Sequence, residues 1–389
     1  MRARGAAVAA SAIVVAVVAV VIGHRTVARP MSARPFPPRP APPSTTATDG
    51  PTSGLHQAWH WEPPPVSNVG MPAADADGVA VTYGHVGVAL VGPDGRERWR
   101  ADRTGVREVA PLLEGDLVVV ATDEGLVAWD RADGHRRWEV ALADRANTPV
   151  AAGPLLLATT WDGSLSAVRR ADGGPTWSCR LPGVALGPPA TDGVTVVASW
   201  EAEGGEVAGL AAFDAATGAA RWSRPLPAEG VSAPAVAGAD DPLVVVVAGD
   251  GRLHGFDLAD GGARWQVPVG GPGAPEVPPL VDGRVLVAGH RLGGMAGVDL
   301  TGRRRWEETA EGGTAVRGGA APAGGHGYVL PLDSGELLVA TAGGGTQVLD
   351  PPGRVSGVAA GPSGVLLVAT GGEDQNHLFA VAGWQPAVE

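Results

Sequence analysis

Oxygen- and nitrogen-bearing side chains gather at two places where their spacing could hold a metal ion. Asp75 and Asp77 before Gly78 look like the start of a calcium loop, but the position that needs a bidentate glutamate is Val86. The run 373–377 (Glu-Asp-Gln-Asn-His) carries a denser set of oxygen ligands. Among the nine histidines, no pair has metal-ligand spacing within an acidic or cysteine context. We expect solvated turns and no metal site, with calcium at 373–377 as the open alternative.

Residue types for covalent chemistry are sparse. Cys179 is the only cysteine, so neither an internal disulfide nor a cysteine-based metal cluster can form. Next to Trp177, it is expected to be a small buried strand residue. The glycine-rich strings 270–273 and 343–345 precede no helical pattern, which excludes a nucleotide-binding loop. No serine lies in a nucleophile elbow. These residues favour binding without catalysis and without a cofactor.

The chain is acidic, with a formal net charge of −12 over 389 residues, and its basic residues other than histidine are all arginine. Residues 1–54 carry six arginines and one aspartate, so the negative excess belongs to the remainder. Because phosphate binding needs clustered positive charge, nucleic acid is not expected as a partner. An acidic surface is compatible with an exported soluble domain.

A repeat sets the elements that would position any site. Aspartate or threonine, glycine, three variable residues and tryptophan recur six times, ending at Trp99, Trp138, Trp177, Trp222, Trp265 and Trp306. Successive tryptophans lie 39 to 45 residues apart. A period near 40 residues indicates a repeat fold.

Each repeat predicts four short antiparallel strands, which we name A to D. In one unit the apolar or alternating runs span 111–113, 117–122, 126–129 and 136–140, with Gly/Asp turns between them. Runs of this length are typical of strands, and Asp-Gly favours a tight hairpin because glycine accepts a positive φ. The tryptophan lies on the outermost strand D. Four-stranded units at this period predict propeller blades.

The two ends of the domain predict a closed ring. Trp61 lies 38 residues before Trp99 on what looks like a lone strand D, whereas 355–362, 365–370 and 377–382 look like strands A, B and C. The N-terminal strand would complete the last blade and remove two exposed edges. A seventh repeat has Gln347 at the tryptophan position. The predicted fold class is therefore all-β, an eight-bladed propeller of four-stranded antiparallel blades over 55–389.

Several units resemble the quinoprotein-type, or PQQ-like, repeat. The matching residues are Val127-Ala128-Trp129-Asp130 before Gly134 and Trp138, Ala212-Phe213-Asp214 before Gly218 and Trp222, and Gly255-Phe256-Asp257 before Gly261 and Trp265. The resemblance covers residues 55–389. It implies an eight-bladed propeller whose tryptophans dock between neighbouring blades, each against the glycine-rich turn of the next repeat.

The same resemblance includes quinone-dependent dehydrogenases, which are the alternative function. Those enzymes stack PQQ under a disulfide between adjacent cysteines and hold calcium with Glu, Asn and Asp. This chain has one cysteine, and Asn68 and Asn147 lie in no acidic cluster. Its repeats also lack the long insertions of the enzymes. We therefore expect a non-enzymatic branch without the PQQ–calcium site of those enzymes.

Residues 1–54 predict a membrane anchor and a tether. Residues 5–23 carry no charge, and at about 1.5 Å per residue such a helix spans a hydrocarbon core of about 30 Å. Arg2 and Arg4 favour a cytoplasmic end at 1–4 and an extracytoplasmic remainder. The Pro-rich segment 24–54 predicts a disordered linker. The alternative is a cleaved signal peptide and a secreted protein.

Binding residues concentrate on variable loops that a rigid scaffold holds. The turns between strands B and C vary most, share one face with the connections between blades, and are longest at 201–207, 289–294 and 371–377. The candidate partner-binding residues are His85, Glu201, Glu203, His290, Arg291, Glu373, Asp374 and His377. The sequence thus predicts a membrane-tethered extracytoplasmic scaffold for an unknown protein or envelope ligand. A sensor that acts through a membrane partner is a further alternative.

Overall fold

A computed structural model of the chain describes residues 56–64, 68–226, 230–270, 277–282, 285–290, 294–309, 321–324, 327–332, 336–341, 346–349, 354–360, 366–371 and 377–382. For some strand residues, His290 and His377 among them, only the backbone is described. Contacts between Cα atoms separate the chain into residues 1–50 and residues 51–389. The predicted cytoplasmic end (1–4), membrane helix (5–23) and linker (24–54) lie outside the described residues.

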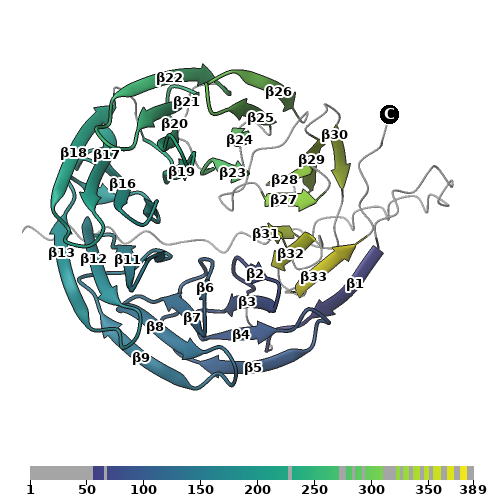
Figure 1. Ribbon diagram of the computed structural model, residues 1–389. Coiled ribbons are helices and arrows are strands. Elements are labelled where there is room, and N and C mark those ends of the chain that lie inside the picture. The colour runs from purple at the N-terminus through teal and green to yellow at the C-terminus, as the bar shows by residue number, and fades with distance from the viewer. Residues whose placement is uncertain are drawn as a thin grey trace, which may run out of the picture. The chain divides into compact units, whose positions relative to one another are not determined.

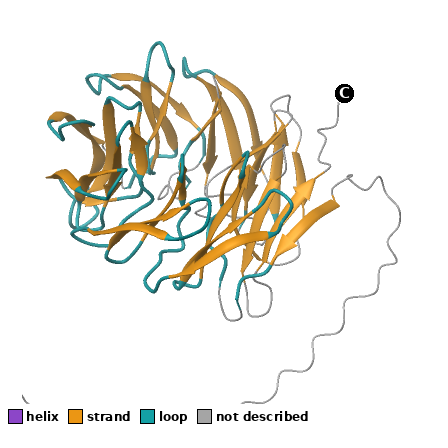
Figure 2. Ribbon diagram, turned by 60° about the horizontal axis from the view of Figure 1, so that its bottom comes forward, coloured by secondary structure: helices purple, strands orange, loops and turns teal. Residues whose placement is uncertain are grey.

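Strands and loops make up the described part of residues 51–389 (Figure 2). In that part of the chain there is no helix that could span a membrane. The strands form eight separate antiparallel sheets, of which seven have four strands and one has five.

The strand bounds, in chain order, follow the predicted repeats. The first two complete sheets contain β2 (Ala73–Asp75), β3 (Gly78–Tyr83), β4 (Gly87–Val91) and β5 (Glu97–Asp102), then β6 (Leu112–Glu114), β7 (Leu117–Ala121), β8 (Gly125–Asp130) and β9 (Arg136–Ala141). The next two contain β10 (Val150–Ala152), β11 (Leu155–Thr159), β12 (Ser164–Arg169) and β13 (Pro175–Arg180), then β14 (Val184–Ala185), β15 (Ala190–Thr191), β16 (Thr195–Glu201), β17 (Ala208–Asp214) and β18 (Ala220–Leu226).

The remaining sheets continue the pattern to the C-terminal unit. They contain β19 (Ala235–Ala237), β20 (Leu243–Ala248), β21 (Arg252–Asp257) and β22 (Ala263–Pro268), then β23 (Leu280–Asp282), β24 (Val285–His290), β25 (Gly294–Asp299) and β26 (Arg304–Thr309). After them come β27 (Ala321–Gly324), β28 (Gly327–Pro331), β29 (Leu337–Thr341) and β30 (Thr346–Leu349). The last sheet joins β31 (Arg354–Ala360), β32 (Leu366–Gly371) and β33 (His377–Ala382) to the N-terminal β1 (His56–Trp61).

Within residues 51–389 the sheets stand around a ring, with β5, β9, β13, β18 and β22 along its outer side (Figure 1). Strands near the centre touch their counterparts in neighbouring sheets, as β2 touches β6 and β31, and β19 touches β15 and β23. The predicted pairing of the N-terminal strand with the C-terminal unit is present, because β1 pairs with β33.

The burial pattern explains why the middle strands are continuously apolar. Every residue of β7 (Leu117–Ala121) is buried, because neighbouring sheets cover both faces of the strand. In contrast, β9 (Arg136–Ala141) alternates and buries Trp138 while its neighbours face outward. The sheets therefore pack face to face through their middle strands, and strand D forms the outer surface.

A β-bulge recurs on strand D, directly before each repeated tryptophan. Ala128 pairs with Trp138, but Trp129 pairs with Arg136, which leaves Arg137 as the extra residue. The same shift occurs in the sheets that contain Trp99, Trp177, Trp222, Trp265 and Trp306. A bulge redirects the side chains beside it. The bulge before each tryptophan therefore determines the direction in which the indole points.

Five of the repeated tryptophans dock onto the glycine of the next repeat, as the resemblance implies, and the turn at 342–345 that would receive Trp306 lies outside the described residues. The indole nitrogens of these five donate hydrogen bonds to a carbonyl oxygen in the same turn as that glycine; for Trp138 the acceptor is Arg170, at 2.9 Å. A Cβ atom on the glycine would collide with the ring, so no other residue fits there. The pairs are Trp99 on Gly134, Trp138 on Gly173, Trp177 on Gly218, Trp222 on Gly261, and Trp265 on Gly302.

The first docked tryptophan is Trp59, and the prediction that Trp61 is the counterpart of Trp99 is wrong. Trp59 lies against Gly95, donates to the Pro93 carbonyl oxygen at 3.0 Å, and follows the shift in register between β1 and β33. Trp61 is two residues further along the strand and belongs to the buried core, where its Nε1 donates to Glu97 Oε2 at 2.9 Å. The spacing to Trp99 did not distinguish Trp59 from Trp61, because the two side chains lie on the same face of the strand.

The residue before the tryptophan and the last residue of strand C form an ion pair that the sequence interpretation missed. Arg221 Nη2 donates to Asp214 Oδ2 at 2.8 Å, and Asp214 Oδ1 also accepts from the Thr217 N–H and hydroxyl. Equivalent pairs are Arg137–Asp130, Arg264–Asp257 and Arg305–Asp299. An aspartate seven, or once six, residues before the arginine was the signal that could have found them.

This pairing predicts a dependence of stability on acid. The Arg221 guanidinium, followed by the Thr217 hydroxyl, lowers the pKa of Asp214 to about 2. A carboxyl whose pKa is lower in the folded chain adds stability above its ordinary value near 4, and this stability is lost as the pH falls towards 2. We expect Asp214→Asn, and likewise Arg221→Gln, to flatten the fall in melting temperature between pH 4 and pH 2. Acid limbs parallel to that of the parent chain would contradict the assignment.

Candidate interaction face

The turns between strands B and C share one face with the connections between sheets, which together we call the B–C face. Residues of these connections pair with the ends of strand B, as Val106 pairs with Thr122 and Ala146 with Thr160. The turns that carry the docked glycines follow strand C at its other end, so they lie on the opposite face. The predicted division of the turns between two faces is therefore present in the described sheets.

A series of backbone hydrogen bonds ties the B–C face together from sheet to sheet. The Gly105 N–H donates to the His85 carbonyl, and the Gly105 carbonyl accepts from the Asp123 N–H at 2.8 Å. The series continues from Leu142 N–H to the Glu124 carbonyl, and from Trp161 N–H to the Arg145 carbonyl. Because each connection is held by the turns on both sides, the side chains of this face stand on a rigid frame.

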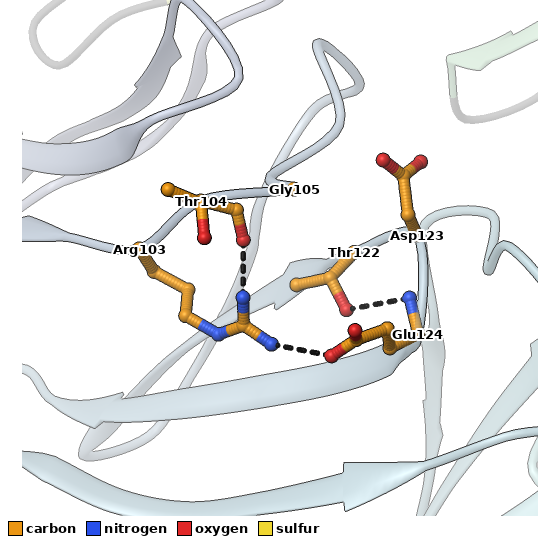
Figure 3. Close-up of a pocket in the computed structure, with 6 residues that line it drawn as sticks. All are labelled: Arg103, Thr104, Gly105, Thr122, Asp123 and Glu124. Carbon is orange, nitrogen blue, oxygen red and sulfur yellow. Dashed lines mark hydrogen bonds and ion pairs between the residues drawn. The ribbon is translucent and has the colours of Figure 1, made fainter.

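A small pocket of about 130 Å³ opens on this face, lined by Arg103, Thr104, Gly105, Thr122, Asp123 and Glu124 (Figure 3). Arg103 is fully engaged there: its Nη2 donates to Glu124 Oε2 at 2.9 Å and to Glu139 Oε1 at 2.7 Å. The Asp123 carboxylate points away from that pair in Figure 3. Its Oδ1 lies 3.9 Å from Nη1 of a second arginine, Arg107.

Three of the predicted partner-binding residues lie on this face with described side chains. His85, in the β3–β4 turn, has a φ of 53°, and its Nδ1 lies 2.9 Å from the Val106 carbonyl oxygen. Glu201 ends β16, where it pairs with Val184 and Ala208. Glu203 is exposed in the β16–β17 turn. His85 and Glu201 belong to different sheets, so they do not form one site.

The other five predicted residues are described only in part or not at all. His290 ends β24 and pairs with Gly294, and His377 begins β33 and pairs with Thr370. Their backbones thus border turns between strands B and C. Arg291, Glu373 and Asp374 lie outside the described residues, as does most of the 373–377 run. These residues stay predictions.

The sequence interpretation missed the apolar side chains of the B–C face. Among the described residues, the exposed large apolar side chains are Val86, Trp161, Val184, Val207 and Val194, and all but Val194 lie on this face. Trp161 is a tryptophan outside the Gly-x-x-x-Trp pattern, in the β11–β12 turn. Its position outside the repeat pattern could have identified Trp161 as a candidate surface residue, but the repeat favoured the docked tryptophans.

Two other groups could have supplied chemistry. Asp130, Asp133 and His135 lie close enough to share a metal ion, but Asp130 is held by Arg137 and the Ala132 N–H, and Asp133 by His135. Asp75 accepts from the Asp77 N–H of its own turn and forms an ion pair with Arg131. Cys179 is half-buried, less than predicted, and burial raises the pKa of its thiol to about 11. The thiol is therefore protonated at neutral pH.

Comparisons with known proteins agree with this architecture. The model of a PQQ-like repeat family, described as outer membrane protein assembly factor BamB, matches residues 51–178 and 161–381. The crystal structure of BamB from Moraxella catarrhalis superimposes with a TM-score of 0.64 at 18% identity, covering 84% of this chain and 97% of that one. The computationally designed Ika8 protein gives 0.63 at 15% identity, covering 81% and 96%.

The search of curated proteins found no match. The identities to the two solved structures are low, so those likenesses show the fold, a PQQ-like β-propeller. The family model, in contrast, matches most of the chain. The chain belongs to the PQQ-like repeat family described as outer membrane protein assembly factor BamB.

Proposed function

We propose that this protein is a membrane-tethered, extracytoplasmic propeller of eight blades that binds a protein partner through its B–C face, without catalysis. The observation that carries the proposal is the uneven distribution of exposed apolar side chains. Of the exposed large apolar side chains in the described part of the chain, Val86, Trp161, Val184 and Val207 lie on that face and Val194 lies on the other. Exposed apolar side chains gathered on one face are typical of an interaction site.

The rigid frame supports the same proposal. A scaffold must present its loops in a fixed arrangement, and backbone hydrogen bonds hold the turns of the B–C face from His85 to Trp161. The eight described sheets, with β1 completing the last one, are the basis for counting eight blades. The family description, an assembly factor, suits a scaffold. We do not assign the family's role in outer-membrane protein assembly to this chain, because it has no cysteine near its apolar N-terminal stretch that could carry a lipid anchor.

The tether and the absence of catalysis are proposed from the sequence. Residues 5–23 are uncharged and long enough to span a membrane, and a Pro-rich stretch follows them. Secretion after cleavage is the alternative. A quinone-dependent dehydrogenase is disfavoured because Cys179 cannot form the disulfide that stacks on PQQ in the enzymes that the repeat resembles.

Photo-crosslinking from matched positions on the two faces tests the proposed function. A photoreactive amino acid replaces Val86 or Val207 on the B–C face, and Val194 on the opposite face, in the full chain in its native envelope. All three side chains are exposed valines. We expect a discrete crosslinked partner from positions 86 and 207 and none from 194. A partner captured from 194, with none from 86 or 207, would assign binding to the other face.

A further inference from the structure

Trp161 is held on the B–C face by two arginines from separate segments. The guanidinium carbon of Arg107 lies 4.7 Å from the centroid of the indole ring, and that of Arg145 lies 4.3 Å away. Arg107 is in the β5–β6 connection and Arg145 in the β9–β10 connection. Guanidinium groups over an indole face are attracted by the ring electrons. Trp161 nevertheless remains 44% exposed, unlike the docked Trp138 at 7%.

The two arginines keep hydrogen-bond donors that the described residues do not use. Arg107 Nε is buried without a hydrogen-bond acceptor among them, and the side chain is only 16% exposed. The nearest carboxylate oxygens lie 3.9 Å from Arg107 and 3.7 Å from Arg145, in Asp123 and Asp144. Both distances exceed hydrogen-bond length.

Arg103 and Arg264, on the same ring, differ from this pair. Arg103 and Arg264 donate to carboxylates at 2.6–2.9 Å. A guanidinium has five N–H donors in a rigid fork that matches a carboxylate. Contact with the Trp161 ring engages Arg107 and Arg145 without using these donors. The cluster is therefore arranged for an acceptor that comes from outside.

We propose that Trp161, Arg107 and Arg145 form a docking site for a carboxylate side chain in an acidic segment of a partner protein. This inference rests on the proposed function, because it assigns the chemistry of the partner on the same face. A carboxylate takes bidentate, charge-assisted hydrogen bonds from the guanidinium groups. The exposed indole covers an apolar neighbour of that carboxylate.

The surroundings favour a single carboxylate over an anionic membrane. Asp123 and Asp144 flank the two arginines and are themselves partly exposed. A membrane presents phosphates over a wide, flat area and would meet these acids at once. One carboxylate on an extended chain can reach between the two arginines and avoid them. The acidic side chains beside the two arginines therefore favour one carboxylate on an extended chain over a flat anionic surface.

Peptide binding to the full chain in detergent tests the site. The probe is a fluorescein-labelled peptide of repeated Gly-Glu-Leu-Asp units, compared with its Gly-Gln-Leu-Asn counterpart by fluorescence anisotropy. We expect the acidic peptide to bind and its amide counterpart not to. Arg145→Gln or Trp161→Ala should weaken binding about tenfold, which corresponds to one charge-assisted contact. Arg96→Gln, an exposed arginine in the turn of the opposite face, is the control and should have no effect.

Several results would overturn the proposal. These are failure of the acidic peptide to bind, equal binding of the amide peptide, or equal weakening by Arg96→Gln. Binding to phosphatidylglycerol vesicles that Arg145→Gln abolishes would assign the arginines to a membrane surface instead. If the partner crosslinked from position 86 survives Arg145→Gln, the B–C face still binds it but the carboxylate site is wrong. If positions 86 and 207 capture nothing while the peptide binds as expected, the assigned partner face fails and the site remains an anion site.

Discussion

Replacing Trp138 by alanine is expected to lower the free energy of unfolding by about 3–5 kcal/mol. The indole is buried between two sheets, lies against Gly173 and donates to the Arg170 carbonyl. Alanine would leave a void at the junction and an acceptor without its donor, and a close-packed junction relaxes only in part. Chemical denaturation of the full chain, followed by circular dichroism, measures the effect.

Trp161→Ala is the matched control, since it removes an indole that no neighbouring sheet covers. Its cost should stay within about 1–2 kcal/mol, the contribution of two exposed cation–π contacts. If Trp138→Ala and Trp161→Ala were equally destabilising, docking against the next repeat would not be what stabilises the ring. An unchanged melting temperature in Trp138→Ala would refute the docking role outright.

Adding a single methyl group at Gly173 is expected to be nearly as damaging. A Cβ atom there would lie 2.7 Å from the Trp138 ring, and the residue has a φ of +68°. The backbone conformation alone costs an L-residue about 1–2 kcal/mol. The collision adds a further cost of about 1–3 kcal/mol, because the ring is fixed by its hydrogen bond and cannot move aside. Denaturation of Gly173→Ala measures the sum.

Gly153 provides a control in the same sheet that separates these two costs. Its φ is +57°, and an added Cβ atom would meet nothing within 4 Å. Gly153→Ala should therefore show the backbone cost alone. In a Trp138→Ala background, Gly173→Ala should fall to the cost of Gly153→Ala, because the obstructing ring is gone. Additive effects of Trp138→Ala and Gly173→Ala would contradict direct contact between them.

Local patterns predicted the strands well, because strand type depends on neighbouring residues. In the second complete sheet the predicted 117–122 and 136–140 correspond to β7 (Leu117–Ala121) and β9 (Arg136–Ala141). The error at Trp61 has a physical cause. A bulge between Gln57 and Trp59 shifts the register by one residue, and a short strand with two tryptophans does not reveal where that shift falls.

The candidate site was less predictable, because its parts are distant in the chain. Arg107, Arg145 and Trp161 come from two connections and one turn, and only the stacking of sheets brings them together. Turn length favoured 201–207, 289–294 and 371–377 as candidate sites, whereas the β11–β12 turn, which carries Trp161, is short. The length of a turn can be read from the sequence. The exposure of Trp161 and the unused N–H donors of the two arginines depend on which residues surround them in the folded protein.

The pairing of β1 with β33 has a consequence for the order in which the protein is made. Each docked tryptophan lies against the repeat that follows it in the chain, so each of these contacts can form as soon as the next repeat is synthesised. The strand pairing of β1 differs, because its partner β33 (His377–Ala382) follows all the other described strands in the chain. Until β33 is made, β1 presents an open edge, which is prone to pair with other chains. The ring is therefore at its most vulnerable in the interval before the C-terminal unit arrives, and the strand next to the proposed tether is the last to be paired.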